Sequence, residues 1–261
     1  AEGTITTYES ALRTHVLDAI GFMRVTDVTT GHIQQILDGI GTKGARDNAH
    51  RVMRSMFSAA VKSKSVPLTF SPVADVDVPR TKTRNRDNET LDPEKYIEAD
   101  EFHAIVSQMP LKLQAGPIIA YWCALRLGEV LGLQRRDFRN LDDPDRATVT
   151  IARQWNSKSH PPQYTDPKAG SVGTIPIPKA VLPLIIAHLD AYVGDSPKSA
   201  YIPSSDDPLR PVSQTTLDNQ WRKARDTVRP EIVFHDLRHT ALTNFGAMGT
   251  TTAEIMAYGR H

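Results

Sequence analysis

The sequence predicts a mostly α-helical protein with a small antiparallel β-sheet or hairpin in its second half. Apolar residues recur at spacings of three and four over most of the chain, as they do on the buried face of amphipathic helices. The alternation that is typical of strands is confined to two short stretches, 147–155 and 173–178. At 261 residues the chain is long enough for two domains, each with its own core.

The first 65 residues predict several helices. One amphipathic pattern covers residues 12–20, and a second begins at Thr30, whose hydroxyl is expected to cap the helix. A third runs from about Arg46 to Val61. Its polar side, with the turn before it, carries Lys43, Arg46, Arg51 and Arg54. Such a row is either a solvated helix face or a surface that rests on DNA phosphates, and the sequence leaves both interpretations open.

The stretch that follows lacks sustained periodicity and is rich in Pro, Asp, Asn and Arg, which predicts a linker. Its basic residues would either follow a phosphate backbone or remain solvated: Arg80, Lys82, Arg84 and Arg86. A second domain is expected to begin near Tyr96, with Asp100 as a helix cap. The predicted organisation is a helical domain at 1–79, a basic linker at 80–95 and a second domain at 96–261.

The segment PIIAYWCALRLGEVLGL is apolar except for Arg126 and Glu129. We expect its helix to reach Leu125, to turn at Gly128 and to continue through Leu131. A guanidinium in such surroundings is costly to desolvate without a partner, and Glu129 is the obvious one. The pair is either a structural ion pair or a functional arginine with the carboxylate that orients it.

The two predicted strands are joined by a turn-rich segment that contains Lys168, which by itself would be an ordinary loop lysine. Further helices are expected at 180–192, at 213–228 and from near His235. His235 and Arg238 are three residues apart, so they share a face near the start of the last of these helices. A planar cation beside an imidazole suits a phosphate that undergoes transfer. Thr252 is expected to cap a short final helix.

The composition describes an ordinary soluble protein, with 39% apolar and 23% charged residues and no apolar run that could span a membrane. The N-terminus does not resemble a secretory signal, and the single cysteine, Cys123, lies in an apolar context that predicts burial. A reducing cytoplasm is therefore expected. The net charge of +1 gives little indication of a nucleic-acid partner, but the basic residues are clustered.

Four motifs in order resemble the tyrosine recombinases, the phage integrase family. They are ALRLGEVLGL with Arg126, Lys168 ahead of the TIPIP strand, the HDLRHT box with Arg238, and His261 at the usual interval after that arginine. The resemblance covers residues 96–261 at motif level, and the N-terminal segment by position and character only. It implies a helical core-type DNA-binding domain joined to an α+β catalytic domain, expected to clamp around DNA.

The resemblance implies a site-specific recombinase that cuts and rejoins DNA through a 3′-phosphotyrosyl intermediate, for integration and excision of a phage or mobile element. The two arginines would clamp the scissile phosphate, with Glu129 orienting the first. The lysine would protonate the leaving 5′-oxygen, the first histidine would assist proton transfer, and the last would hydrogen-bond a phosphate oxygen. No metal or cofactor is needed, because the arginines supply the positive charge. The expected catalytic residues are Arg126, Lys168, His235, Arg238 and His261.

The implied partner is double-stranded DNA at core attachment sites, bound by a homotetramer on paired sites, with a monomer in the absence of DNA. An accessory DNA-bending protein is compatible with this scheme, a membrane partner is not expected, and the location would be the nucleoid of a bacterial host cytoplasm. The sequence departs from the family pattern in two places. Arg260 stands where glycine is usual, and the nucleophilic tyrosine is expected about nine residues beyond His261. We therefore expect these residues to bind DNA without cleaving it, and Tyr258 to be a packing residue.

Two other classes compete with this interpretation. HDLRH also resembles the zinc-hydrolase pattern HExxH, with His235 and His239 as ligands, but Asp236 is shorter than the catalytic Glu and Arg238 would repel the metal. A DNA-binding regulator without catalysis could use the same scaffold, although a pure binder has no need of all the catalytic side chains. The related topoisomerases of type IB share the chemistry, but the helical N-terminal half is more similar to integrases.

Overall fold

The computed structural model describes residues 2–63, 65–77, 95–167 and 171–260. The chain divides into two compact units, Ala1–Asn85 and Arg86–His261. Almost all of the predicted linker at 80–95 lies outside the described residues. None of the described helices combines the length and the apolar character that a membrane span needs.

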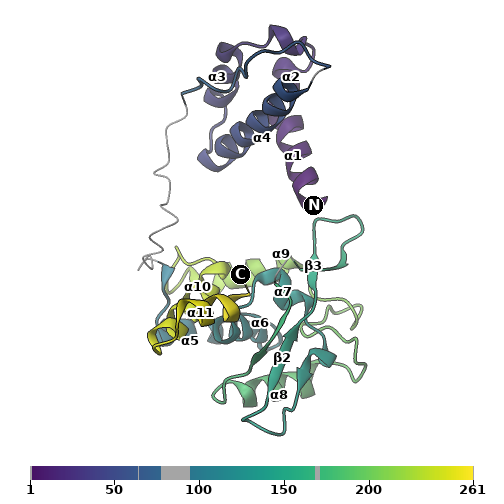
Figure 1. Cartoon of the computed structure of the whole chain (residues 1–261). Helices are drawn as coiled ribbons and strands as arrows, with labels where there is room; N and C mark the ends of the chain where they lie inside the picture. The colour runs from purple at the N-terminus through teal and green to yellow at the C-terminus, as the bar shows by residue number, and fades with distance from the viewer. Residues whose placement is uncertain (1, 64, 78–94, 168–170, 261) are drawn as a thin grey trace. The chain divides into compact units, whose positions relative to one another are not determined.

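The N-terminal unit is built from helices around one apolar core (Figure 1). Its elements are α1 (Glu2–His15), α2 (Leu17–Ile20), the 3-10 turn η1 (Val25–Asp27), α3 (Thr30–Asp38) and α4 (Lys43–Lys62). Helix α4 packs against α1 and α3. Ile33 and Leu37 of α3, with Met53 and Phe57 of α4, are buried almost completely. Each pair is spaced by four residues, so both members face the same side of their helix.

The second unit is centred on one buried helix. Its helices are α5 (Ala99–Ser107), α6 (Leu111–Cys123), α7 (Leu127–Gly132), α8 (Leu182–Tyr192), α9 (Gln214–Arg225), α10 (Phe234–Ala247) and α11 (Thr252–Gly259). Helix α6 contacts α5, α7, α8, α9 and α10, and its sequence is apolar on all sides, as a helix in the middle of a core requires. The packing of α6 on α10 brings residues near 124 close to those near 238 (Figure 1).

Two small antiparallel sheets complete this unit. One has the order β1 (Phe138–Arg139), β2 (Thr148–Ile151), β5 (Gly173–Pro176); the other pairs β3 (Gln154–Asn156) with β4 (Gln163–Thr165), and a 3-10 turn, η3 (Arg135–Asp137), precedes β1. Helix α7 lies directly on β3. A Cβ atom at Gly132 would be 2.5 Å from the carbonyl oxygen of Arg153, so the close approach of α7 requires glycine at this position.

The predicted fold class is confirmed, but two predicted details are wrong. The strand expected at 147–155 is interrupted, because β2 ends at Ile151 and β3 begins at Gln154 in a different sheet. The turn expected at Gly128 occurs earlier, at Ala124, whose φ of 52° is left-handed, while Gly128 lies inside α7. Neither site has a glycine or proline to mark it, which is why the pattern placed them elsewhere.

Several helices also begin earlier than predicted. The observed N-cap residues are Thr29 where Thr30 was predicted, Glu98 where Asp100 was predicted, and Thr251 where Thr252 was predicted. Thr251 shows why. Its backbone N–H donates to Glu254 at 2.7 Å, while its hydroxyl accepts from the backbone N–H of Glu254 at 3.3 Å. The position of the reciprocating glutamate selects one of several adjacent threonines.

Candidate functional site

The turn between α6 and α7 places Arg126 at the start of α7. Left-handed Ala124 ends α6, and the chain is extended at Arg126, whose side chain is 27% exposed. Its guanidinium Nη1 donates to Glu129 Oε1 at 2.6 Å and to the hydroxyl of Ser171 at 3.1 Å. Its backbone N–H donates to Glu129 Oε2 at 3.0 Å. The ion pair expected between Arg126 and Glu129 is thus present.

The Glu129 carboxylate is buried, with 2% of its side chain exposed, and it pairs with two arginines rather than one. Oε1 accepts from Arg126, and Oε2 accepts from Arg260 Nη2 at 2.7 Å. Burial alone would raise the pKa of this carboxyl, but the charges of Arg260 and Arg126 and the hydrogen bonds from Arg126 hold the pKa below its ordinary value. Glu129 is therefore ionised at neutral pH.

Arg238 lies on the buried side of α10 and is only 2% exposed. Its Nη1 donates to the carbonyl oxygen of Ala124, and its Nη2 donates to the carbonyl oxygen of Gly259 at the end of α11. Burial, together with repulsion from Arg126 and Arg260, lowers the pKa of Arg238 to about 10. The side chain thus remains charged at neutral pH, in a place where an anion would relieve that repulsion.

Arg260 is a member of this site that the sequence did not predict. Its Nη2 donates to Glu129 and, at 3.1 Å, to the same Ala124 carbonyl that accepts from Arg238. Its Nη1 donates to the carbonyl oxygen of Tyr258 at 3.2 Å. The departure from the family's usual glycine marked this position in the sequence, but the pattern gave no indication that the side chain folds inward.

We call Arg126, Arg238, Arg260 and Glu129 the arginine cluster. It joins three guanidinium groups to one carboxylate, so it carries an excess of positive charge. Most of the cluster is buried, where charges are weakly screened. Such a site favours a bound anion, and the planar forks of arginine match the oxygens of a phosphate.

His235 and His239 stand one turn apart on α10, with ring centroids 5.0 Å apart in an edge-to-face arrangement. His235 is exposed. Partial desolvation, with the charges of His239 and Arg238, lowers the pKa of His235 below 6.5, so its imidazole is neutral at neutral pH. The Asp236 carboxylate accepts from the backbone N–H of Val233 at 2.9 Å. Within the described residues no group of three His, Cys, Asp or Glu side chains could hold a metal ion.

Tyr258 is a packing residue, as predicted. Its ring stacks on Phe245 with centroids 4.4 Å apart, and its hydroxyl donates to the carbonyl oxygen of Trp122 at 2.7 Å. Burial raises the pKa of Tyr258 above the ordinary tyrosine value, so its hydroxyl is a poor source of a phenolate nucleophile. Nearby Cys123 is fully buried, as expected, and burial raises the pKa of its thiol to about 12.

Several predicted site residues lie outside the described residues. Lys168 and His261 are among them. The predicted linker cations lie outside as well: Arg80, Lys82, Arg84 and Arg86.

The four predicted DNA-binding cations of α4 differ in their surroundings. Lys43, Arg51 and Arg54 are exposed, and at 3.6 residues per turn they fall within about one quarter of the helix circumference. We call these three residues the basic face of α4. Arg46 is bonded within its own unit instead, because its guanidinium donates to the carbonyl oxygens of Leu37 and Ile40 at 3.0 Å each. Arg46 therefore stabilises the end of α3 and does not belong to the basic face.

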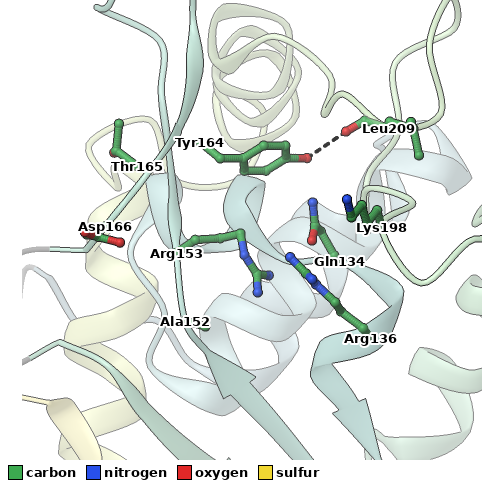
Figure 2. Close-up of a pocket in the computed structure, with 9 residues that line it drawn as sticks. All are labelled: Gln134, Arg136, Ala152, Arg153, Tyr164, Thr165, Asp166, Lys198 and Leu209. Carbon is green, nitrogen blue, oxygen red and sulfur yellow. Dashed lines mark hydrogen bonds between the residues drawn. The ribbon is translucent and has the colours of Figure 1, made fainter.

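A cavity of about 670 Å³ lies elsewhere in the second unit, between β4, the segment before β3 and the loop after α8. Figure 2 shows Arg136, Arg153 and Lys198 directed into it, with the Tyr164 ring alongside. The Arg153 guanidinium is paired with Asp137 at 2.5 Å. Among the described residues, none of the predicted catalytic side chains Arg126, His235 and Arg238 lines this cavity, and neither does any member of the arginine cluster.

Comparison with known sequences finds integrases. Residues 1–40 match the family model described as the phage integrase, N-terminal SAM-like domain. The chain is 26% identical over 253 residues to a prophage phiRv2 integrase of Mycobacterium tuberculosis (strain CDC 1551 / Oshkosh), covering 95% of the chain and 64% of that protein. It is 24% identical over 262 residues to the integrase of Mycobacterium phage L5, covering 98% of the chain and 67% of that protein. The chain thus spans less than two thirds of the phiRv2 integrase.

Comparison with solved structures finds the same fold throughout the chain. The Tn1549 transposon integrase, in complex with transposon right end DNA, superposes with a TM-score of 0.72 at 15% identity, covering 99% of this chain and 85% of that one. A lambda integrase dimer bound to a COC′ core site gives a TM-score of 0.70 at 16% identity, covering 100% and 88%. The chain is thus similar in sequence to phage integrases, and it shares its fold with solved integrases of the tyrosine recombinase type.

Proposed function

We propose that this protein is a site-specific DNA recombinase that integrates and excises a phage or other mobile element. The observation that supports the proposal most strongly is the arginine cluster. Segments that are far apart in sequence bring three guanidinium groups to one turn, where a single buried carboxylate only partly neutralises them. A structural ion pair would need one arginine for one carboxylate, whereas a phosphate site needs surplus charge.

The cluster would stabilise the transition state of phosphoryl transfer. Negative charge accumulates on the non-bridging oxygens of the pentacoordinate phosphate, so fixed donors directed at those oxygens dominate the catalysis. Arg126, whose side chain is 27% exposed, would contact one oxygen directly. Arg238, whose planar fork matches phosphate oxygens and whose position is fixed by the carbonyls of Ala124 and Gly259, would supply the second contact.

In the proposed step a tyrosine oxygen attacks the scissile phosphorus. The new phosphorus–oxygen bond forms as the bond to the 5′-oxygen breaks, leaving a 3′-phosphotyrosyl enzyme and a 5′-hydroxyl. Neutral His235 would accept the tyrosine proton, and Lys168 would donate the proton that the 5′-oxygen takes up. His261 would hydrogen-bond a phosphate oxygen. Attack by the 5′-hydroxyl of a second strand reverses the step and joins the new partner.

We infer that the attacking tyrosine is not Tyr258, because its hydroxyl is committed to the Trp122 carbonyl. The family pattern places the nucleophile beyond His261. These 261 residues by themselves are therefore expected to bind DNA and to leave it uncleaved. The proposed mechanism uses guanidinium groups in place of a metal ion or another cofactor.

The proposed partner is double-stranded DNA at core attachment sites. Residues 1–79 would act as a core-type DNA-binding domain and residues 96–261 as the catalytic domain, with the basic linker at 80–95 between them. The basic face of α4 supports this assignment, because exposed cations on one side of a helix are suited to phosphate contacts. We further propose that the protein is a monomer in the absence of DNA and assembles as a homotetramer on paired sites. An accessory DNA-bending protein and a location in the bacterial nucleoid are part of the same proposal.

The decisive test is capture of the covalent intermediate. The protein, extended through the segment after His261, is incubated with a library of nicked duplexes, and protein–DNA adducts that survive SDS are isolated and digested. We expect a tyrosine peptide that carries a 3′-nucleotide. Retention of duplexes without any adduct would overturn the recombinase proposal in favour of a DNA-binding regulator. An adduct on Tyr258 would overturn the assignment of the nucleophile.

A further inference from the structure

Arg260 occupies a backbone conformation that favours glycine. It follows α11 with φ of 55° and ψ of 53°, and its backbone N–H donates to the carbonyl oxygen of Ala257 at 3.1 Å. Glycine adopts this left-handed conformation readily, whereas a residue with a Cβ atom is strained in it. An arginine at this position therefore needs side-chain contacts that offset the strain.

The contacts of the Arg260 side chain are extensive. Only 2% of the side chain is exposed, and its two terminal nitrogens make the three contacts already described, to Glu129, Ala124 and Tyr258. A Cβ atom at Gly173 would lie 3.2 Å from Arg260 Cδ, so the first residue of β5 packs closely on the arginine stem. The guanidinium is consequently held by the backbone of α11, by Glu129 of α7 and by the turn after α6, while β5 packs on the aliphatic stem.

Each contact that Arg260 makes within the cluster is shared with one of the other two arginines. Glu129 Oε2 accepts from Arg260 and from the backbone N–H of Arg126, while Oε1 accepts from the Arg126 guanidinium. The Ala124 carbonyl accepts from both Arg260 and Arg238. Arg260 therefore shares one hydrogen-bond acceptor, Glu129, with Arg126 and another, the Ala124 carbonyl, with Arg238. Arg126 and Arg238 are the two predicted phosphate ligands.

We propose that Arg260 is a positioning residue that fixes the separation and orientation of Arg126 and Arg238 for the scissile phosphate. The inference rests on the proposed recombinase function. Without Arg260, the Glu129 carboxylate would lose the guanidinium that holds its second oxygen, so the carboxylate and the Arg126 guanidinium that it orients would be free to turn away from the phosphate. The Ala124 carbonyl would lose one of its two donors, and the turn that carries Arg126 would be less restrained.

The bonding of Arg260 determines which step it affects. Its two terminal nitrogens are bonded to Glu129 and to the Ala124 and Tyr258 carbonyls. The proposed phosphate contacts come from Arg126 and Arg238, so loss of Arg260 should leave duplex affinity nearly unchanged. Small misplacements of a group that contacts the reacting atoms slow catalysis strongly. The effect of Arg260 should therefore be seen in the rate of strand cleavage, and only where negative charge on the phosphate oxygens has to be stabilised.

The experiment compares the wild type with Arg260→Gly, which relieves the backbone strain and removes the contacts, and Arg260→Lys, which keeps the charge but loses the fork. Arg222→Ala is the matched control, because it removes an exposed arginine from an ion pair with Asp218. The first readout is NMR of the Arg126 guanidinium in the 261-residue chain, where restricted rotation about the Nε–Cζ bond reports how firmly the group is held. Arg126 should lose this restriction in Arg260→Gly and keep it in Arg222→Ala.

The second readout uses the protein extended through its nucleophile and the duplex that the wild type cleaves. Arg260→Gly should slow cleavage about 10- to 100-fold on the ordinary phosphodiester. On a methylphosphonate at the scissile position, which lacks the negative charge, the difference should shrink to within about threefold. A merely structural defect would slow both substrates alike.

Unchanged Arg126 rotation in Arg260→Gly, or an equal loss on both substrates, would overturn the proposal for Arg260. If the wild type cleaves no duplex, the recombinase proposal fails instead, and the NMR readout still decides whether Arg260 holds Arg126.

Discussion

The arginine cluster and the basic face of α4 both gather cations, but they hold them in opposite ways. In the cluster, Arg238 and Arg260 are almost fully buried, and every guanidinium donates to a carbonyl or carboxylate oxygen. On α4, Lys43 and Arg54 are exposed, and Arg51, also exposed, donates to Asn48 on its own helix at 2.6 Å. Buried, fixed cations can be directed at charge that develops at one atom, whereas exposed, mobile cations suit the replacement of counterions along DNA.

Arg46 shows that residue type alone does not separate these classes. It lies on α4 among the basic residues, yet its guanidinium closes the C-terminal end of α3 through Leu37 and Ile40. The same side chain is a binding residue, a catalytic residue or a helix cap according to what surrounds it. Predictions that separate stability, binding and catalysis therefore test the comparison directly.

The largest effect is expected from the carboxylate of the cluster. Glu129→Gln keeps the shape of the side chain but leaves three guanidinium groups without their counter-charge. Removing one partner of a buried ion pair costs about 3–5 kcal/mol, so the free energy of unfolding of the second unit should fall by that order. Urea denaturation measures it. Asp218→Asn, which breaks the exposed pair with Arg222, is the control and should cost less than about 1 kcal/mol. Equal losses would show that the cluster has no special electrostatic role.

The next effect concerns catalysis. Arg238→Lys retains a cation but cannot hold the Ala124 and Gly259 carbonyls and a phosphate oxygen together, because an ammonium lacks the planar fork. Loss of one such donor costs about 10²–10³ in rate. Single-turnover cleavage by the full-length protein should slow by that factor, while the dissociation constant for duplex DNA changes by less than about threefold. A parallel loss of affinity would make Arg238 a docking residue.

A smaller effect should distinguish two arginines of one helix. Arg46→Ala should lower the free energy of unfolding of the N-terminal unit by about 1–3 kcal/mol, because charged hydrogen bonds to the end of α3 are lost. Arg54→Ala should leave stability within about 0.5 kcal/mol and reduce the slope of log K against log salt by about one. Urea denaturation and fluorescence anisotropy over a salt series measure the two quantities. A reduced slope in Arg46→Ala with unchanged stability would reverse the assignment.

The smallest effect is the pH dependence that His235 introduces. Its folded pKa lies below 6.5, so in the window below 6.5 the unfolded chain binds the proton first. Stability should therefore decrease as the pH falls from 6.5 towards the folded pKa, and the cleavage rate should decrease as His235 loses its capacity to accept a proton. His235→Gln should flatten both profiles in this window. A wild-type rate that rises with acidity would contradict the role of His235 as a proton acceptor.

The sequence was sufficient for the fold class and for the expectation that Arg126 pairs with Glu129, because both follow from local patterns. Apolar periodicity identified the helices, and an arginine in an apolar helix has to find a carboxylate within reach. The sequence did not predict that Arg260 belongs to the cluster. The inward orientation of its side chain depends on a left-handed backbone conformation after α11 and on the space left by Gly173, and no sequence pattern indicates either condition.

The predicted positions of the helix caps and turns differ from the observed ones for a related reason. Adjacent threonines are equivalent by composition, and the glutamate at Glu254 selects Thr251 only once the helix has formed. The turn at Ala124 could not be predicted from a glycine, because it contains none. The carbonyl oxygen of Ala124 accepts from both Arg238 and Arg260. A strained non-glycine residue at the centre of the cluster is typical of sites that are fixed by tertiary contacts.

The most direct test of the whole account measures binding and covalent chemistry on the same two variants. Arg126→Ala alters the arginine cluster, and the double variant Arg51→Ala, Arg54→Ala alters the basic face of α4. Duplex affinity and the rate of adduct formation at saturating protein are measured for each in the full-length protein. We predict that Arg126→Ala abolishes the adduct and leaves affinity within about threefold, while the double variant loses affinity and keeps the adduct rate. If both variants lose affinity and adduct to the same degree, the division between catalytic and binding cations is wrong.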